Sequence, residues 1–219
     1  GVTGRRPFPA VEVFAEHLSS WGIDSDSQVV VYDADGGLMS AARVWLMLRW
    51  MGHERVAVLD GGWQAWLAAE APTESAVRLR PTTNFIARPR PDLLADVSEV
   101  DRARQLTPTR VFDSRGAEGY HGRGVYHDPV RGHIAGVGLA DRAHTLDGDR
   151  RYRTADELRR HYGELIGDQD PHDVIFYCGS GITAAQNVLA MTIAGLDGAR
   201  MYVGSWSEWI TDPSRPVEL

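Results

Sequence analysis

The sequence contains one structural unit twice, and this internal repeat constrains the fold more than any other feature. Alanine, leucine, glycine and tryptophan residues of one segment recur in a later segment at a constant spacing. The matched pairs are Ala41 and Ala184, Ala42 and Ala185, Leu46 and Leu189, Gly52 and Gly195, Gly61 and Gly204, Trp63 and Trp206, and Trp66 and Trp209. Self-similarity over a segment of this size indicates two copies of one supersecondary unit.

Each copy begins with a short run of β-branched and aromatic residues, at 29–32 and 174–177, which is typical of a buried strand. A glycine-containing loop, a helix, a second strand and a short helix with tryptophans follow in both copies; the second strands are expected at 56–59 and 201–203. Strands that alternate with helices predict an α/β fold with mostly parallel sheets and helices on both faces.

Several prolines, Pro72, Pro81, Pro89 and Pro91, lie among polar residues between the copies and favour an extended connection. We therefore expect a first domain at 1–75, a linker at 76–91 and a second domain at 92–219. The second copy has further predicted elements in front of it, namely helices near 97–105 and 154–166 and a strand at 110–112. The first copy has only a helix at 10–20, so the first domain is expected to be incomplete at its amino terminus.

Charge and hydropathy exclude several classes of protein. Lys and Arg number 23 against 30 Asp and Glu, a net charge of −7, which would repel a nucleic-acid backbone. No stretch approaches the roughly 18 to 20 continuous apolar residues of a membrane-spanning helix. No signal segment precedes the first predicted helix, and a cytoplasmic location is expected. The sequence has 1 cysteine, so neither an internal disulfide nor a cysteine-based zinc site is expected.

That cysteine, Cys178, comes directly after a predicted buried strand and before a helix, at the edge of the sheet where α/β proteins place their sites. Gly179 and Gly181 allow successive N–H groups to turn inward, and the helix start adds partial positive charge. Both effects favour a thiolate with a lowered pKa, which is a ready nucleophile. A small buried apolar residue is the alternative interpretation of a single cysteine. The first copy has Asp33 at the corresponding position, so only the second can be nucleophilic.

The chain resembles the tandem rhodanese-like sulfurtransferases, and among them the 3-mercaptopyruvate type. The resemblance covers nearly the whole chain and is carried by four motifs: the Cys-Gly-Ser-Gly-Ile-Thr loop at 178–183, Gly-His-Ile-Ala-Gly at 132–136, Asp-Ser-Arg at 113–115 and Gly-Ser-Trp-Ser-Glu-Trp at 204–209. The segment Leu-Asp-Gly-Gly-Trp at 59–63 is similar to the non-catalytic first domain of the family.

The resemblance implies that Cys178 takes a sulfur from a small-molecule donor as a persulfide and passes it to a thiol, a thioredoxin-like protein or cyanide. It implies Ser180 as a second catalytic residue that helps proton movement. The donor-binding loop would comprise Gly179, Gly181, Ile182 and Thr183. The resemblance implies no cofactor and no metal. Within the family, loops similar to Cys-Arg-Lys-Gly use thiosulfate, whereas Cys-Gly-Ser-Gly is similar to the mercaptopyruvate type.

Two positions depart from the family pattern. The family arginine that binds the substrate carboxylate is replaced by Gly119, and the nearby Arg123 is the candidate substitute because its fork suits a carboxylate. A solvated surface arginine is the alternative interpretation of Arg123. The resemblance also implies an Asp and a His that complete a triad with Ser180, and both are expected in the front part of the first domain that we take to be missing.

Other functions remain open or are excluded by particular residues. A rhodanese-like module used only for binding is the main alternative, and thiosulfate is a less favoured donor because Gly179 and Ser180 bring no charge. A tyrosine-phosphatase loop would need His before the cysteine and Arg six residues after it, where this chain has Tyr177 and Ala184. Structural roles are expected for three further sets of residues: His133, the pair Asp113 and Arg115, and Trp206 with Trp209.

Overall fold

The structure is a computed structural model that describes residues 3–76, 78–123 and 127–219. The chain forms two compact units. The amino-terminal unit is Phe8–Pro91, and the carboxy-terminal unit is Asp92–Leu219 together with the residues up to Pro7. The amino-terminal unit therefore includes the expected linker at 76–91, and residues 3–7 pack with the unit that contains Cys178.

The amino-terminal unit is built from α1 (Val11–Ser20), β1 (Val29–Val31), α2 (Ser40–Trp50), β2 (Val56–Val58) and α3 (Gly62–Ala68). The two strands pair in parallel with Val29 opposite Val56, as a strand–helix–strand crossover requires. Its core lies between α1, α2 and one face of this sheet, where Phe14, Leu18 and Met51 are buried.

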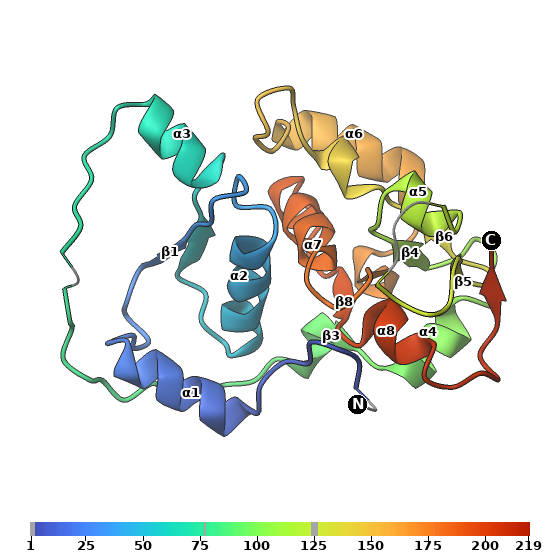
Figure 1. The fold of residues 1–219 in the computed structure, drawn as a ribbon, viewed down its shortest axis with the longest axis horizontal. Helices are drawn as coiled ribbons and strands as arrows, with labels where there is room; N and C mark the ends of the chain where they lie inside the picture. Colours follow the sequence, from blue (N-terminus) through green and yellow to red (C-terminus); the bar gives the residue numbers. More distant parts are fainter. Residues whose placement is uncertain (1–2, 77, 124–126) are drawn as a thin grey trace. The chain divides into compact units, whose positions relative to one another are not determined.

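The proline-rich segment after α3 has no helix or strand in its described residues from 71 to 90 (Figure 1). Its second half nevertheless packs on the amino-terminal unit. Phe85 is buried, its amide donates to Ser19 Oγ at 3.0 Å, and the amide of Arg88 donates to the carbonyl of Met51 at 2.9 Å. These contacts explain why the segment belongs to the amino-terminal unit although its composition is that of a connection.

The carboxy-terminal unit is a five-stranded parallel sheet with helices on both faces (Figure 1). The strand order is β3-β8-β7-β4-β6, and β5 and β9 form a separate antiparallel pair. The strands are β3 (Leu94–Ala95), β4 (Val111–Asp113), β5 (His133–Ile134), β6 (Gly138–Leu139), β7 (Ile175–Tyr177), β8 (Arg200–Tyr202) and β9 (Val217–Glu218). The helices are α4 (Val97–Ala103), α5 (Ala117–Tyr120), α6 (Ala155–Ile166), α7 (Ala184–Ile193) and α8 (Ser205–Trp209), with short 3₁₀ turns η1 (Pro91–Leu93), η2 (Arg142–Thr145) and η3 (Pro171–Asp173).

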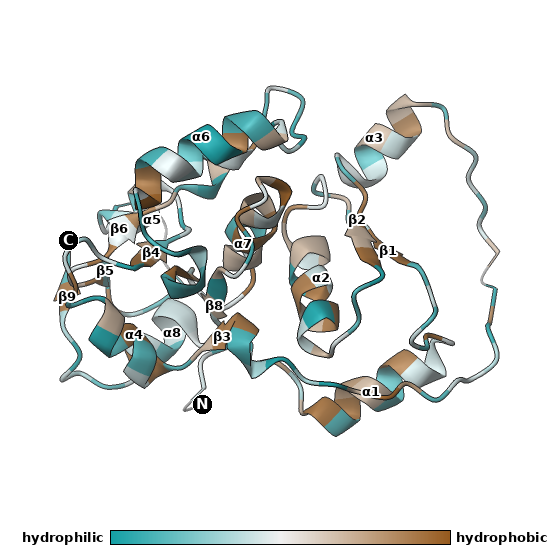
Figure 2. Ribbon diagram, turned by 180° about the vertical axis from the view of Figure 1, so that it is seen from behind, coloured by the Kyte–Doolittle hydropathy of each residue, from teal (hydrophilic) through white to brown (hydrophobic). Residues whose placement is uncertain are grey.

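Alternate residues of the central strand β7 face the two helical layers. Ile175 and Tyr177 pack in a cluster with residues of α4 and α8, whereas the ring of Phe176 lies 6.1 Å from that of Tyr162 on α6. In Figure 2, α6 is hydrophilic over most of its surface with a few apolar positions; its buried residues are Leu158, Tyr162 and Ile166, four apart, as in an amphipathic helix. The predicted α/β fold with a parallel sheet and flanking helices is confirmed.

Candidate active site

Cys178 lies in the loop between β7 and α7, at the carboxyl edge of the central strands of the sheet. It is 1% exposed. Gly181 adopts a φ of +80°, a conformation that an L side chain rarely takes, so this turn requires glycine. The loop turns sharply enough to bring its own amides round the sulfur.

The environment of Cys178 stabilises a thiolate. Burial alone acts to raise the pKa of the thiol, but hydrogen bonds from the Thr183 hydroxyl and from the amides of Ala184, Ser180 and Ile182 outweigh it. The pKa of Cys178 is therefore lowered from its ordinary value. A buried thiol with a lowered pKa has the character of a nucleophile rather than of a packing residue.

Ser205, at the start of α8, contacts both the backbone amide and the sulfur of Cys178. Its hydroxyl donates to the carbonyl of Tyr202 at 2.9 Å and accepts the amide of Cys178 at 3.2 Å, and its Oγ is 3.8 Å from the Cys178 sulfur. The backbone of Ser205 has a φ of +54°, an unfavourable conformation for a residue other than glycine. Strain of this kind is held in place by surrounding contacts and is common at functional sites.

The amino-terminal turn of α8 also fixes the carbonyls of the Cys178 loop. The amide of Trp206 donates to the carbonyl of Cys178 at 2.9 Å, and that of Ser207 to the carbonyl of Gly179 at 3.0 Å. The loops after β7 and β8 meet because these strands are parallel neighbours in the sheet.

Asp113 and Arg115 form the ion pair expected from the sequence, and it lies beside the site. Arg115 bonds the carboxylate of Asp113 through Nε at 3.0 Å and Nη2 at 2.6 Å, and Nη2 also donates to the carbonyl of Gly132 at 2.7 Å. The guanidinium stacks 5.1 Å from the ring centroid of Trp206. A β-carbon at Gly179 would lie 3.9 Å from Cδ of Arg115, so the pair borders the Cys178 loop.

The remaining predicted site residues differ in their positions. Ser180, Ile182 and Thr183 surround the sulfur as described, and the side chain of Ser180 is half-buried. Arg123, the candidate carboxylate-binding residue, follows α5; its side chain is 63% exposed and its Nε lies 3.9 Å from Glu118.

Sequence reasoning missed Arg5. Its amide donates to Ser207 Oγ at 3.0 Å, its guanidinium pairs with Asp128, and it reaches to within 4.0 Å of the position a β-carbon of Gly179 would take. Nothing in the local sequence signals this position, because it arises from contacts with residues far along the chain.

The amino-terminal unit repeats the same anion-binding loop around a carboxylate. Asp33 accepts backbone N–H groups from Asp35 at 2.9 Å, Gly37 at 2.8 Å, Met39 at 3.3 Å and Ala41 at 3.0 Å. Burial acts to raise the pKa of Asp33, but these bonds outweigh it and lower the pKa from its ordinary value. The loop of the first copy thus holds its own negative charge where the second copy has a thiol.

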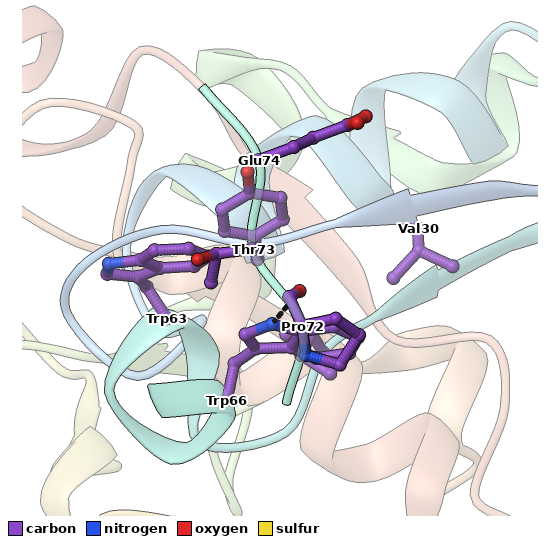
Figure 3. Close-up of a pocket in the computed structure, with 8 residues that line it drawn as sticks. Val30, Trp63, Trp66, Pro72, Thr73 and Glu74 are labelled. Carbon is purple, nitrogen blue, oxygen red and sulfur yellow. Dashed lines mark hydrogen bonds between the residues drawn. The ribbon is translucent and has the colours of Figure 1, made fainter. Parts of the chain in front are cut away.

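A separate cavity of about 410 Å³ lies in the amino-terminal unit (Figure 3). The rings of Tyr32 and Trp63 stack at 5.8 Å, and Trp66 Nε1 donates to the carbonyl of Pro72 at 3.1 Å. The cavity is lined by Val30, Tyr32, Leu59, Trp63, Trp66, Pro72, Thr73 and Glu74. These residues include neither cysteine nor histidine, so this cavity holds no thiol nucleophile.

In residues 3–76, 78–123 and 127–219, no three His, Cys, Asp or Glu side chains gather as metal ligands would. In the same part of the chain, no helix combines the length and apolar character needed to cross a membrane.

Known proteins resemble this chain over nearly its whole length. The rhodanese-like domain family matches residues 3–69 and 96–212. A probable 3-mercaptopyruvate sulfurtransferase of Pseudomonas aeruginosa is 40% identical over 219 residues, 99% of this chain and 76% of that protein. The 3-mercaptopyruvate sulfurtransferase of Homo sapiens is 32% identical, over 92% of this chain and 68% of its own. The structure of the Leishmania major 3-mercaptopyruvate sulfurtransferase matches with a TM-score of 0.79 and 28% identity, over 95% of this chain and 58% of that one.

Proposed function

Given that this chain belongs to the rhodanese-like sulfurtransferases, we propose that it moves sulfur from 3-mercaptopyruvate to a thiol through a persulfide on Cys178. The observation that carries the proposal is the loop of hydrogen-bond donors around a buried cysteine of lowered pKa. Sulfur transfer needs a thiolate that attacks in the first step and leaves in the second. Relatives at 40% and 32% identity that are named for this activity support the choice of donor.

The first step forms one bond and breaks one. The Cys178 thiolate attacks the sulfur of 3-mercaptopyruvate, and a sulfur–sulfur bond forms as the carbon–sulfur bond of the donor breaks. The electron pair of the broken bond passes to carbon as the enolate of pyruvate, which takes up a proton. Pyruvate leaves, and Cys178 retains the outer sulfur as a persulfide.

In the second step a thiolate acceptor attacks the outer sulfur. The sulfur–sulfur bond to Cys178 breaks, the acceptor becomes a persulfide, and Cys178 leaves as a thiolate. The same donors from Thr183, Ser180, Ile182 and Ala184 stabilise that thiolate, so they favour both steps. The Ser180 hydroxyl is assigned to proton movement at the substrate.

The acceptor is a small thiol or the exposed thiol of a thioredoxin-like protein. The persulfide sulfur is the only atom that must be reached, so either acceptor needs access to the Cys178 loop alone. A cytoplasmic setting, with its reduced thiols, suits such an acceptor and stays a prediction.

Mass spectrometry after incubation with 3-mercaptopyruvate and no acceptor tests the proposal. We expect Cys178 to gain the mass of one sulfur atom, with about one pyruvate released per chain, and a thiol added afterwards to remove that sulfur. Cys178→Ser is the matched control and should gain nothing. Pyruvate release without modification of Cys178, or no release at all, would contradict the proposal and favour a module that only binds.

A further inference from the structure

The proposed donor is an anion, yet the loop that would receive it has no cationic side chain of its own. Residues 179–183 are Gly, Ser, Gly, Ile and Thr. A carboxylate that leaves water for a partly buried site needs a charged or strongly hydrogen-bonding partner. Another segment of the carboxy-terminal unit brings an arginine to this loop.

The segment before α1 approaches this loop closely. Gly4 has a φ of +80°, and a β-carbon there would lie 2.5 Å from the carbonyl oxygen of Gly204 and 2.9 Å from Ser207 Oγ. Only glycine permits this contact. The next residue, Arg5, donates its amide to Ser207 Oγ at 3.0 Å, and the amide of Ser207 donates to the carbonyl of Gly179. Two hydrogen bonds thus connect the backbone of Arg5 to the residue after Cys178.

One terminal nitrogen of the Arg5 guanidinium pairs with Asp128, and the other lies next to the Cys178 loop. Nη1 pairs with Asp128, whose side chain is only 12% exposed, and Nη2 lies 4.0 Å from the β-carbon position of Gly179. The Arg5 side chain is 39% exposed, so an incoming anion can reach it. An arginine has five N–H donors, and one carboxylate partner leaves donors for a second.

Arg115 is the other arginine that flanks Gly179 among the described residues, but the donors of its Nε and Nη2 are already engaged and its position is fixed by Asp113. Its Nε and Nη2 bond Asp113, Nη2 also bonds the carbonyl of Gly132, and its plane stacks on Trp206. The side chain of Asp113 is 0% exposed, so moving Arg115 to a substrate would leave a buried carboxylate unpaired.

We propose that Arg5, positioned by Asp128, binds the anionic group of the sulfur donor beside Cys178. The inference builds on the proposed function and replaces Arg123 as the expected carboxylate-binding residue. Both candidate donors, 3-mercaptopyruvate and thiosulfate, carry a negatively charged group next to a transferable sulfur. We expect the α-keto carboxylate of 3-mercaptopyruvate to be the ligand of Arg5, and the anionic oxygens of thiosulfate would meet the same guanidinium.

Steady-state kinetics with Arg5→Gln test this role. We expect the KM for 3-mercaptopyruvate to rise about tenfold to a hundredfold, with kcat changed less than about twofold, because the charge-assisted bond forms when the donor binds. Arg5→Lys keeps the charge and should recover part of the loss. Arg6→Gln removes the neighbouring charge and should leave KM unchanged, as should Arg123→Gln.

Two further sulfur donors test whether Arg5 recognises the negative charge of the donor or the rest of the molecule. Mercaptoacetone lacks the carboxylate, and its kcat/KM should be the same for the native chain and Arg5→Gln. A KM for thiosulfate that rises together with that for 3-mercaptopyruvate would identify Arg5 as a general anion partner, whereas a rise for 3-mercaptopyruvate alone would assign it to the carboxylate. An unchanged KM for both anions in Arg5→Gln, or an equal loss with mercaptoacetone, would overturn the inference.

Binding of pyruvate keeps this test independent of turnover. Pyruvate is titrated calorimetrically into the Cys178→Ser variant and into the double variant that carries both Cys178→Ser and Arg5→Gln. The single variant should bind pyruvate with a dissociation constant about tenfold lower than that of the double variant. Arg5-dependent binding in a chain that shows no sulfur transfer would uphold the anion site while the proposed function fails. Equal binding by both variants, with circular dichroism showing both folded, would refute the anion site whatever the activity.

Discussion

The amide of Ala41 donates to Asp33 Oδ2 at 3.0 Å, and the amide of Ala184, the matching residue of the second copy, hydrogen-bonds the sulfur of Cys178. The two loops therefore bind negative charge in the same way, and only the group that carries the charge differs. In the first copy the charge is a fixed carboxylate. In the second it is a thiolate, which can leave its hydrogen bonds and return to them as sulfur is transferred.

The lowered pKa of Cys178 can be measured directly because the chain has 1 cysteine. We expect thiolate absorbance of the folded chain to rise with pH through a midpoint below that of a free thiol. Thr183→Val removes one hydrogen bond to the thiolate and should move the midpoint upward. Subtracting the titration of Cys178→Ser removes the tyrosine signal, and the same chain in urea gives the unfolded reference. A folded midpoint at or above that reference would be incompatible with the described loop.

Asp33 should make the stability of the amino-terminal unit depend on pH. Its folded pKa is below its ordinary value, so its ionised form stabilises the fold above the unfolded pKa of about 3.9, and this stabilisation is lost as pH falls through the folded pKa. At neutral pH we expect Asp33→Asn to lower the free energy of unfolding by about 1 kcal/mol, a modest value because the carboxylate is only partly buried.

Urea unfolding at a series of decreasing pH values checks this prediction. The difference between the native chain and Asp33→Asn should shrink as the pH falls. Asp26→Asn changes an exposed carboxylate of the same unit and should have little effect at any pH. A difference that grows toward acid pH would show that the ionised Asp33 does not stabilise the loop.

Removal of Arg115 should cost far more stability than removal of an exposed arginine. Arg115→Ala leaves the buried Asp113 carboxylate without its partner, and we expect a loss of about 3 kcal/mol or more. Arg110→Ala breaks an ion pair with Asp173 in which both side chains are 39% to 41% exposed, and should cost about 1 kcal/mol or less. Chemical unfolding of both variants compares the two. Equal losses would mean that the Asp113 pair is not structurally important.

The sequence predicted the main strands because each is a short run of β-branched or aromatic residues between turn signals. The structure places β1, β2, β7 and β8 within one residue of the expected ends. The two-residue strands β3, β5, β6 and β9 were not predicted, since a segment of that length has no periodicity and exists only through its pairing partner.

The site was predictable only where its residues are neighbours in sequence. The Cys178 loop is one such segment, because its glycines and the strand before it predict an anion-binding turn. Ser205 could have been inferred, because the loops after two adjacent parallel strands meet at one edge of the sheet. The position of Arg5 could not, since it depends on the close packing of Gly4 against Gly204 and Ser207.

Sulfide release from 3-mercaptopyruvate and from thiosulfate, each with a thiol acceptor, tests the central claim most directly when the native chain is compared with Cys178→Ser. We expect the native chain to release sulfide from 3-mercaptopyruvate faster than from thiosulfate. Cys178→Ser should release none while retaining the native circular dichroism spectrum. Equal release by the two chains, or none from either donor by a folded native chain, would contradict the assignment of Cys178 as the sulfur-carrying residue.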